Sequence, residues 1–131
     1  MKIGYLYDRA SARLGLNVYN LPEKDQALHV VHELHAFASS HYWLKIVTLE
    51  SAHRKEATQW MKLFLGDKLK ILYVDVSLAN RETRSLLSLA DLMNNDLTKS
   101  ERGAEEIKSI ADVILDNNGS LEATIRQLAL V

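Results

Sequence analysis

The sequence predicts an α/β fold, a three-layer sandwich in which helices flank a small, mainly parallel sheet. Short runs of β-branched and other apolar residues at 44–49, 69–76 and 112–115 indicate strands. Segments with helical spacing of apolar residues separate these runs, and such alternation is typical of βαβ units. The chain has 131 residues without a low-complexity stretch or repeat, so we expect a single domain over residues 1–131.

The first third of the chain is expected to be helical after a short aromatic start. Residues 2–7 form either a strand or the buried beginning of a helix that ends at Gly15, because glycine is a common C-terminal cap. Residues 21–38 carry apolar side chains at the i, i+3, i+4, i+7 spacing of an amphipathic helix. Pro22 suits the first position of that helix, where no backbone N–H is needed.

The middle of the chain is expected to form a strand, a helix and a second strand. After the first strand, Ser51 is placed to cap a helix whose apolar stripe ends at Gly66. The second strand carries apolar side chains on both faces, as buried parallel strands do. Ser77 or Asn80 can then cap a leucine-rich helix that contains Met93.

The last third is expected to contain two more helices around the third strand. Residues 98–101 fit a capping box, which predicts the start of another helix. The strand at 112–115 is followed by Asn-Asn-Gly at 117–119, a turn signal. Ser120 then caps a final helix over residues 121–130.

Composition narrows the classes of function. The net charge is −1, and nucleic-acid binding needs clustered Lys and Arg to neutralise phosphates. The chain has no cysteine, which excludes disulfides and cysteine-based metal sites and suits a reducing compartment. No apolar run approaches the ~20 residues of a membrane span. We therefore expect a cytoplasmic domain that binds neither nucleic acid nor membranes.

The end of the sequence resembles the closing signature of dephospho-CoA kinases and related P-loop nucleotide kinases. Residues 111–122 read ADVILDNNGSLE, similar to the strand, polar turn and helix start of that group. Upstream, residues 66–75 resemble its "G-D-K" strand, and Arg81 and Arg84 match the beginning of its "R-x-x-R" helix. Residues 95–101 resemble the polar stretch after its lid.

This resemblance covers roughly residues 44–128 and implies a truncated P-loop nucleotide-kinase-like fold, but the P-loop itself is missing. Phosphoryl transfer of this type needs G-x-x-x-x-G-K-[ST], whose backbone N–H groups hold the phosphates and whose hydroxyl holds Mg²⁺. None of the five glycines is followed by Lys-Ser or Lys-Thr. In addition, an apolar segment at 86–93 stands where relatives carry further arginine.

The resemblance therefore implies a kinase-like domain that is catalytically inactive alone and acts by binding a nucleotide or phosphate, or by protein association. The alternative is part of an active nucleotide or dephospho-CoA-type kinase whose P-loop lies on another chain or an upstream segment. ATP and magnesium are expected as cofactors only under that alternative. The expected partner is a second copy of the chain or a P-loop-bearing protein.

Glu50 and Arg54 form one candidate site. The resemblance places Glu50 where relatives carry an acidic residue near the acceptor, so it is a candidate catalytic base. Arg54 could hold an anion close to it. The structural alternative is a capped helix start with solvated charges, because acidic residues favour the first helical turn.

Arg81 and Arg84 form a second candidate site, for phosphate. Arginine binds phosphate oxygens in a bidentate manner, and the resemblance assigns both residues to a phosphate-contacting helix. The structural alternative is that they pair with Asp75, Glu82 or solvent.

The leucine-rich helix is a candidate interface. Leu86, Leu89 and Met93 share one face of it, and neighbouring leucines make the apolar surface wider than a peripheral helix needs. Such a face is either core or a homodimer contact.

A histidine-rich segment offers a metal-site hypothesis. His29, His32 and Glu33 lie on the side of the helix opposite its apolar stripe, and two histidines with a carboxylate can hold zinc. A small metal-dependent hydrolase is therefore a further functional alternative. The structural alternative is a solvated helix face, because the order differs from H-E-x-x-H.

Overall fold

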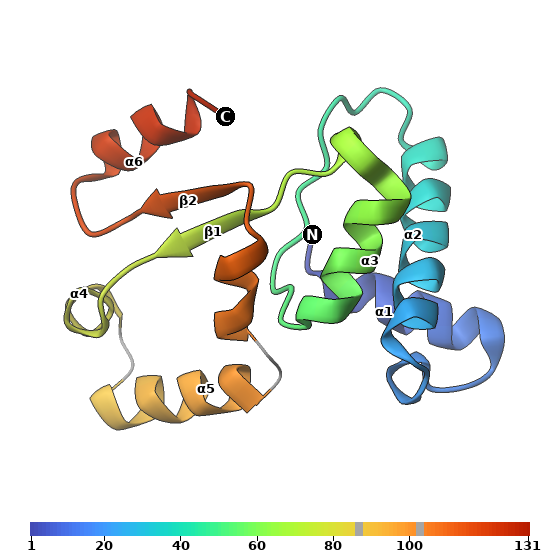
Figure 1. Cartoon of the computed structure of the whole chain (residues 1–131), viewed down its shortest axis with the longest axis horizontal. Helices are drawn as coiled ribbons and strands as arrows, with labels where there is room; N and C mark the ends of the chain where they lie inside the picture. The colour runs from blue at the N-terminus through green and yellow to red at the C-terminus, as the bar shows by residue number, and fades with distance from the viewer. Residues whose placement is uncertain (86–87, 102–103) are drawn as a thin grey trace. The chain divides into compact units, whose positions relative to one another are not determined.

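The computed structural model of the chain describes residues 1–85, 88–101 and 104–131 and divides into two compact units, 1–69 and 70–131 (Figure 1). Each unit is a connected arrangement of short elements. The single domain that the sequence predicts over residues 1–131 stays a prediction. No helix among the described residues is long and apolar enough to cross a membrane.

The first unit is helical. Its elements are α1 (Ile3–Leu14), the 3₁₀ turn η1 (Val18–Asn20), α2 (Glu23–Ser40), α3 (Lys55–Leu65) and the 3₁₀ turn η2 (Gly66–Lys68). Helices α2 and α3 lie side by side, and α1 also packs on α2 (Figure 1). The core consists of apolar side chains from these three helices and from η1: Ile3, Leu6, Tyr7, Ala10, Val18, Ala27, Val30, Val31 and Met61.

Glycines end two of these helices as predicted. Gly15 has φ 68° and ψ 27°, and its N–H donates to the carbonyl of Ser11. Gly66 follows α3 with φ 58° and ψ −133°, a region that side chains with a Cβ rarely adopt. The aromatic start of the chain forms a helix from Ile3, so the second of its two predicted alternatives is correct.

The strand predicted at residues 44–49 is wrong. Among the described residues a single parallel bridge forms just after this segment, between Lys2 and Glu50, and the Ile3 N–H donates to the Glu50 carbonyl at 2.9 Å. Ile46 is 81% exposed. β-branched residues favour a strand only where a neighbouring strand and a buried face receive them, and no such neighbour is present among the described residues.

The helix start predicted at Ser51 is also wrong. Ser51 has φ 68°, whereas a capping residue needs an extended backbone. Helix α3 begins instead after Arg54, whose backbone is extended and whose carbonyl accepts hydrogen bonds from Thr58.

The second unit contains a two-stranded parallel sheet and short helices. Its elements are β1 (Leu72–Asp75), α4 (Leu78–Arg84), α5 (Leu89–Glu101), the 3₁₀ helix η3 (Ala104–Ile110), β2 (Val113–Asp116) and α6 (Leu121–Leu128). In the sheet Leu72 lies opposite Val113 and Asp75 opposite Asp116. The fold is thus mixed α and β, and its two strands are parallel, as the sequence predicts for the sheet.

The strand β1 is shorter and less buried than predicted. Leu72 and Val74 are 38% and 53% exposed, so this face is not covered by helices. The buried apolar residues among those described in this unit are Ile71, Leu92, Ile107 and Leu115. The face of the sheet that carries Leu72 and Val74 is therefore apolar but contributes little to a core.

The single leucine-rich helix predicted after β1 is wrong, because two helices occupy this region. Helix α4 ends at Arg84, and Ser85 is extended with φ −99° and ψ 152°. The Oγ of Ser88 accepts from the Asp91 N–H at 3.1 Å at the start of α5. A serine that competes for backbone hydrogen bonds favours a new helix start over continuation.

Two predicted serine caps are confirmed, and one capping box is not. Ser77 Oγ accepts from the Asn80 N–H and Ser120 Oγ from the Ala123 N–H, both at 3.2 Å. The capping-box side chains at 98–101 lie outside the described side chains. Helix α5 continues through Glu101, so no new helix starts there.

Candidate functional site

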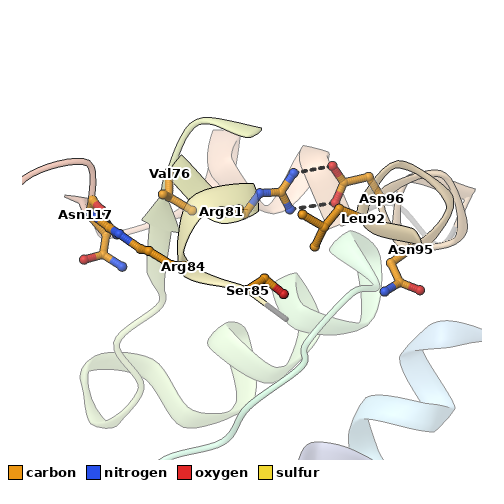
Figure 2. A pocket seen from close by; sticks show the side chains of 8 residues that line it. All are labelled: Val76, Arg81, Arg84, Ser85, Leu92, Asn95, Asp96 and Asn117. Atoms are coloured by element: carbon orange, nitrogen blue, oxygen red, sulfur yellow. Dashed lines mark hydrogen bonds and ion pairs between the residues drawn. The ribbon is translucent and has the colours of Figure 1, made fainter. Parts of the chain in front are cut away.

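A cavity of about 430 Å³ lies in the second unit, at the carboxyl ends of β1 and β2. Its walls come from α4, α5 and the residues directly after the two strands (Figure 2). The lining residues are Val76, Arg81, Arg84, Ser85, Leu92, Asn95, Asp96 and Asn117. Ligands of open α/β sheets favour this end of the strands.

Helix α4 brings the two arginines to the cavity. Ser77 begins the helix directly after β1, and Arg81 and Arg84 are three residues apart, so they project from the same side. Both candidate phosphate residues line one pocket.

Arg81 is held by Asp96 of α5. Its Nη1 donates to Asp96 Oδ1 at 2.7 Å, and its Nη2 donates to Oδ2, so the guanidinium binds both carboxylate oxygens (Figure 2). Hydrogen bonding to Asp96 raises the pKa of Arg81. The Nε–H of Arg81 is buried and has no hydrogen-bond partner among the described residues.

Arg84 is held by main-chain oxygens. Its Nη1 donates to the carbonyl of Asn117, and its Nη2 donates to that of Gly119 at 2.9 Å. These carbonyls carry no formal charge, so the positive charge of Arg84 is not neutralised by them. Arg84 thereby ties α4 to the turn between β2 and α6.

The turn at residues 117–119 has a clear structural role. Asn118 Oδ1 accepts from the Ser77 N–H at 2.7 Å, which joins the ends of the two strands. The backbone N–H and the side chain of Asn118 donate to Asp116 and lower its pKa. The Asn-Asn-Gly turn therefore fixes one wall of the cavity.

In the described part of the chain neither arginine bonds to Asp75 or Glu82, two of the predicted alternative partners. Asp75 accepts from Lys108 Nζ at 3.0 Å, and this bond raises the pKa of Lys108. Sequence reasoning missed Asp96 as the partner of Arg81, because 15 residues separate them in the chain. The only signal for Asp96 was its position in the polar stretch after the leucine-rich segment.

The candidates Glu50 and Arg54 belong to the first unit. The side chain of Glu50 is exposed, and its backbone bonds to Met1 and Ile3. The guanidinium carbon of Arg54 lies 5.2 Å from the centroid of the Tyr19 ring. Among the described residues, no hydrogen bond or ion pair joins Glu50 to Arg54, so the two do not form a site with each other.

Arg54 belongs instead to a cluster that the sequence did not reveal. Burial raises the pKa of Glu23, and a hydrogen bond with Glu56 and the charge of Glu56 raise it further, while Arg54 opposes the effect. Burial also raises the pKa of Tyr7 to about 12. The ring of Tyr7 stacks on Tyr19, with centroids 4.5 Å apart.

The histidine-rich segment is arranged differently from the metal-site hypothesis. Glu33 is only 5% exposed and accepts from Arg13 Nε at 2.6 Å, with Arg9 Nε at 3.8 Å. Arg13 also lies 3.3 Å from His29 Nδ1. The solvated-face alternative is therefore wrong for Glu33, which faces α1. No group of three His, Cys, Asp or Glu residues suited to a metal ion occurs in the described part of the chain.

Of the interface candidates, Leu89 and Met93 lie on α5 and are 40% and 55% exposed. Leu86 lies outside the described residues. Leu92 of the same helix is buried and lines the cavity, so α5 has one inward and one outward apolar side.

Comparison with known proteins gives no relative. No family model, no curated protein and no solved structure matches the chain.

Proposed function

We propose that the second unit binds the phosphoryl group of a small phosphate-bearing ligand, such as a nucleotide, and that this chain alone does not transfer it. The observation that supports this function is the presence of Arg81 and Arg84 in the wall of one cavity. Guanidinium groups suit phosphate because their planar donors match its oxygens in pairs.

The rest of the cavity wall fits such a ligand. Its volume of about 430 Å³ is in the usual range of small-molecule sites. Ser85, Asn95 and Asn117 offer polar groups, and Val76 and Leu92 offer apolar surface for an uncharged part of the ligand. We propose ATP and magnesium as ligands only together with a partner that carries a P-loop.

The proposal that this chain alone does not transfer a phosphoryl group rests on the loops after the strands. Residues 76–77 and 117–120 connect β1 to α4 and β2 to α6, and neither contains G-x-x-x-x-G-K-[ST]. Without that loop no main-chain nest surrounds a triphosphate. The truncated kinase-like three-layer sandwich is part of this proposal, and the parallel pairing of β1 with β2 supports it. A cytoplasmic location is also part of it, and the lack of cysteine supports that location.

Calorimetry tests this proposal. We expect ATP, GTP or dephospho-CoA to give saturable heat with the whole chain and no phosphorylated product. Arg81→Lys and Arg84→Lys should each weaken binding about tenfold, because lysine keeps the charge but loses the paired donors. Arg126→Lys is the matched control, since Arg126 is exposed on α6 and does not line the cavity. Phosphoryl transfer by the purified chain would refute the proposed inactivity.

Protein association is a second candidate function, supported by the outward side of α5. Leu89, Met93 and Leu97 follow one another at four-residue spacing and are 40%, 55% and 60% exposed. Residues at this spacing form a continuous stripe on a helix, and a continuous exposed apolar surface marks an interface. We propose a homodimer through this stripe.

A further inference from the structure

The contact between Arg81 and Asp96 occupies the donors that the proposed function assigns to a ligand. Both carboxylate oxygens of Asp96 accept from the terminal nitrogens of Arg81. A phosphoryl group offers a similar pair of oxygens to a guanidinium. Asp96 and a bound phosphoryl group therefore compete for the same two N–H groups.

We infer that Asp96 is an internal competitor of the ligand, which holds Arg81 in this structure and releases it when a phosphoryl group binds. This inference rests on the proposed function and concerns the regulation of the same site. Because Asp96 belongs to α5 and Arg81 to α4, ligand binding also removes the ion pair that joins these helices.

The charges around the cavity favour such an exchange. Its lining contains two arginines and one carboxylate, so positive charge is in excess while Asp96 is in place. Among the described residues Arg84 bonds to carbonyl oxygens, which leave its charge available to an anion. A phosphoryl dianion that displaces Asp96 enters a cavity that both arginines line.

Breaking the contact between Arg81 and Asp96 also requires little free energy. The side chains of Arg81 and Asp96 are 30% and 36% exposed, and partly exposed ion pairs contribute little to stability. The buried Nε–H of Arg81 has no hydrogen-bond partner in the part of the chain that the structure describes. An unsatisfied buried donor makes a conformation less favourable, so a rearranged Arg81 side chain that pairs this donor gains stability.

Removal of the Asp96 charge tests the inference. Titration of the whole chain with methyl phosphate, followed by NMR at constant ionic strength, gives the dissociation constant. Asp96→Asn is expected to lower it about tenfold, because the ligand no longer displaces a carboxylate. Glu82→Gln is the matched control, since Glu82 lies on α4, is exposed and does not line the cavity. It removes the same charge and should change the constant less than about twofold.

The outcomes separate this inference from the proposed function. If wild type binds and Asp96→Asn binds equally or more weakly, or if Glu82→Gln gives the same gain, the inference falls and the proposed function stands. If neither wild type nor the variants bind, both fall.

A second measurement needs no variant and covers the case in which Asp96→Asn does not fold. Amide hydrogen exchange of α5 in wild type should accelerate at least about threefold at saturating methyl phosphate, because the tie to α4 is lost. Unchanged or slower exchange of α5 in the bound state overturns the inference.

Discussion

Glu33 of α2 accepts a 2.6 Å hydrogen bond from Arg13 of α1, and its side chain is almost fully buried between these helices. Arg9, one turn earlier on α1, approaches the second oxygen at 3.8 Å. The carboxylate that could be taken for a metal ligand is thus part of the contact between two core helices.

Replacement of Glu33 should destabilise the chain. Glu33→Gln leaves two arginines without their counter-charge at a buried position, and we expect the free energy of unfolding to fall by about 1–3 kcal/mol. This is less than for a fully buried pair, because both arginines are partly exposed. Urea denaturation measures it, with the exposed neighbour replaced in His32→Gln as control. Equal stability of the two variants would contradict a structural role for the ion pair.

The carboxyl pair of Glu23 and Glu56 should make stability depend on pH. The pKa of Glu23 is raised in the folded chain, so the folded state binds this proton more tightly than the unfolded state. The resulting stabilisation is complete below the ordinary value of 4.5 and is lost as pH rises through the folded pKa. The stabilisation from Glu23 should therefore be larger at about pH 4 than at about pH 7.

Glu23→Gln tests this pH dependence, because glutamine cannot ionise. We expect the fall to shrink by about 0.5 kcal/mol, a small value because the site is largely hydrated. Urea denaturation at both pH values measures it. Asp8→Asn, an exposed position on α1, serves as the control. If stability falls with pH as much in Glu23→Gln as in wild type, the pKa of Glu23 is not raised in the folded chain.

The outward stripe of α5 should control association. We expect the chain to sediment as a dimer and Met93→Lys to sediment as a monomer, because a charge in the centre of the stripe opposes burial. Met93 is exposed, so the substitution should leave the fold intact. Leu63→Lys is the control, since Leu63 is an exposed apolar residue on α3. A monomeric wild type, or a dimeric Met93→Lys, would contradict the proposed interface.

Local signals in the sequence predicted much of the fold. Gly15 and Gly66 end helices because their backbones need positive φ, and Ser77 and Ser120 begin helices because their hydroxyls accept backbone N–H groups. These features depend on a few neighbouring residues only. The apolar character of residues 69–76 and 112–115 predicted two strands, and the structure pairs them in parallel at 72–75 and 113–116.

Features that depend on distant partners were not predictable in the same way. Residues 44–49 have strand propensity, but a strand also needs a neighbour to pair with. Among the described residues the one bridge near this segment joins Lys2 to Glu50, just after it. The spacing of Arg81 and Arg84 placed them together, whereas their partners Asp96 and Asn117 come from other elements. The burial of Glu33 follows from Arg13, 20 residues earlier, and helical periodicity of α2 alone cannot reveal it.

The central claim is that a phosphoryl group binds beside Arg81 and Arg84, and an NMR titration of the whole chain with AMP tests it most directly. The claim predicts saturable shifts of the Arg81, Arg84 and Asn117 amides, and their loss when both arginines are replaced by lysine. Absence of saturable shifts, or shifts confined to residues 1–69, would contradict it.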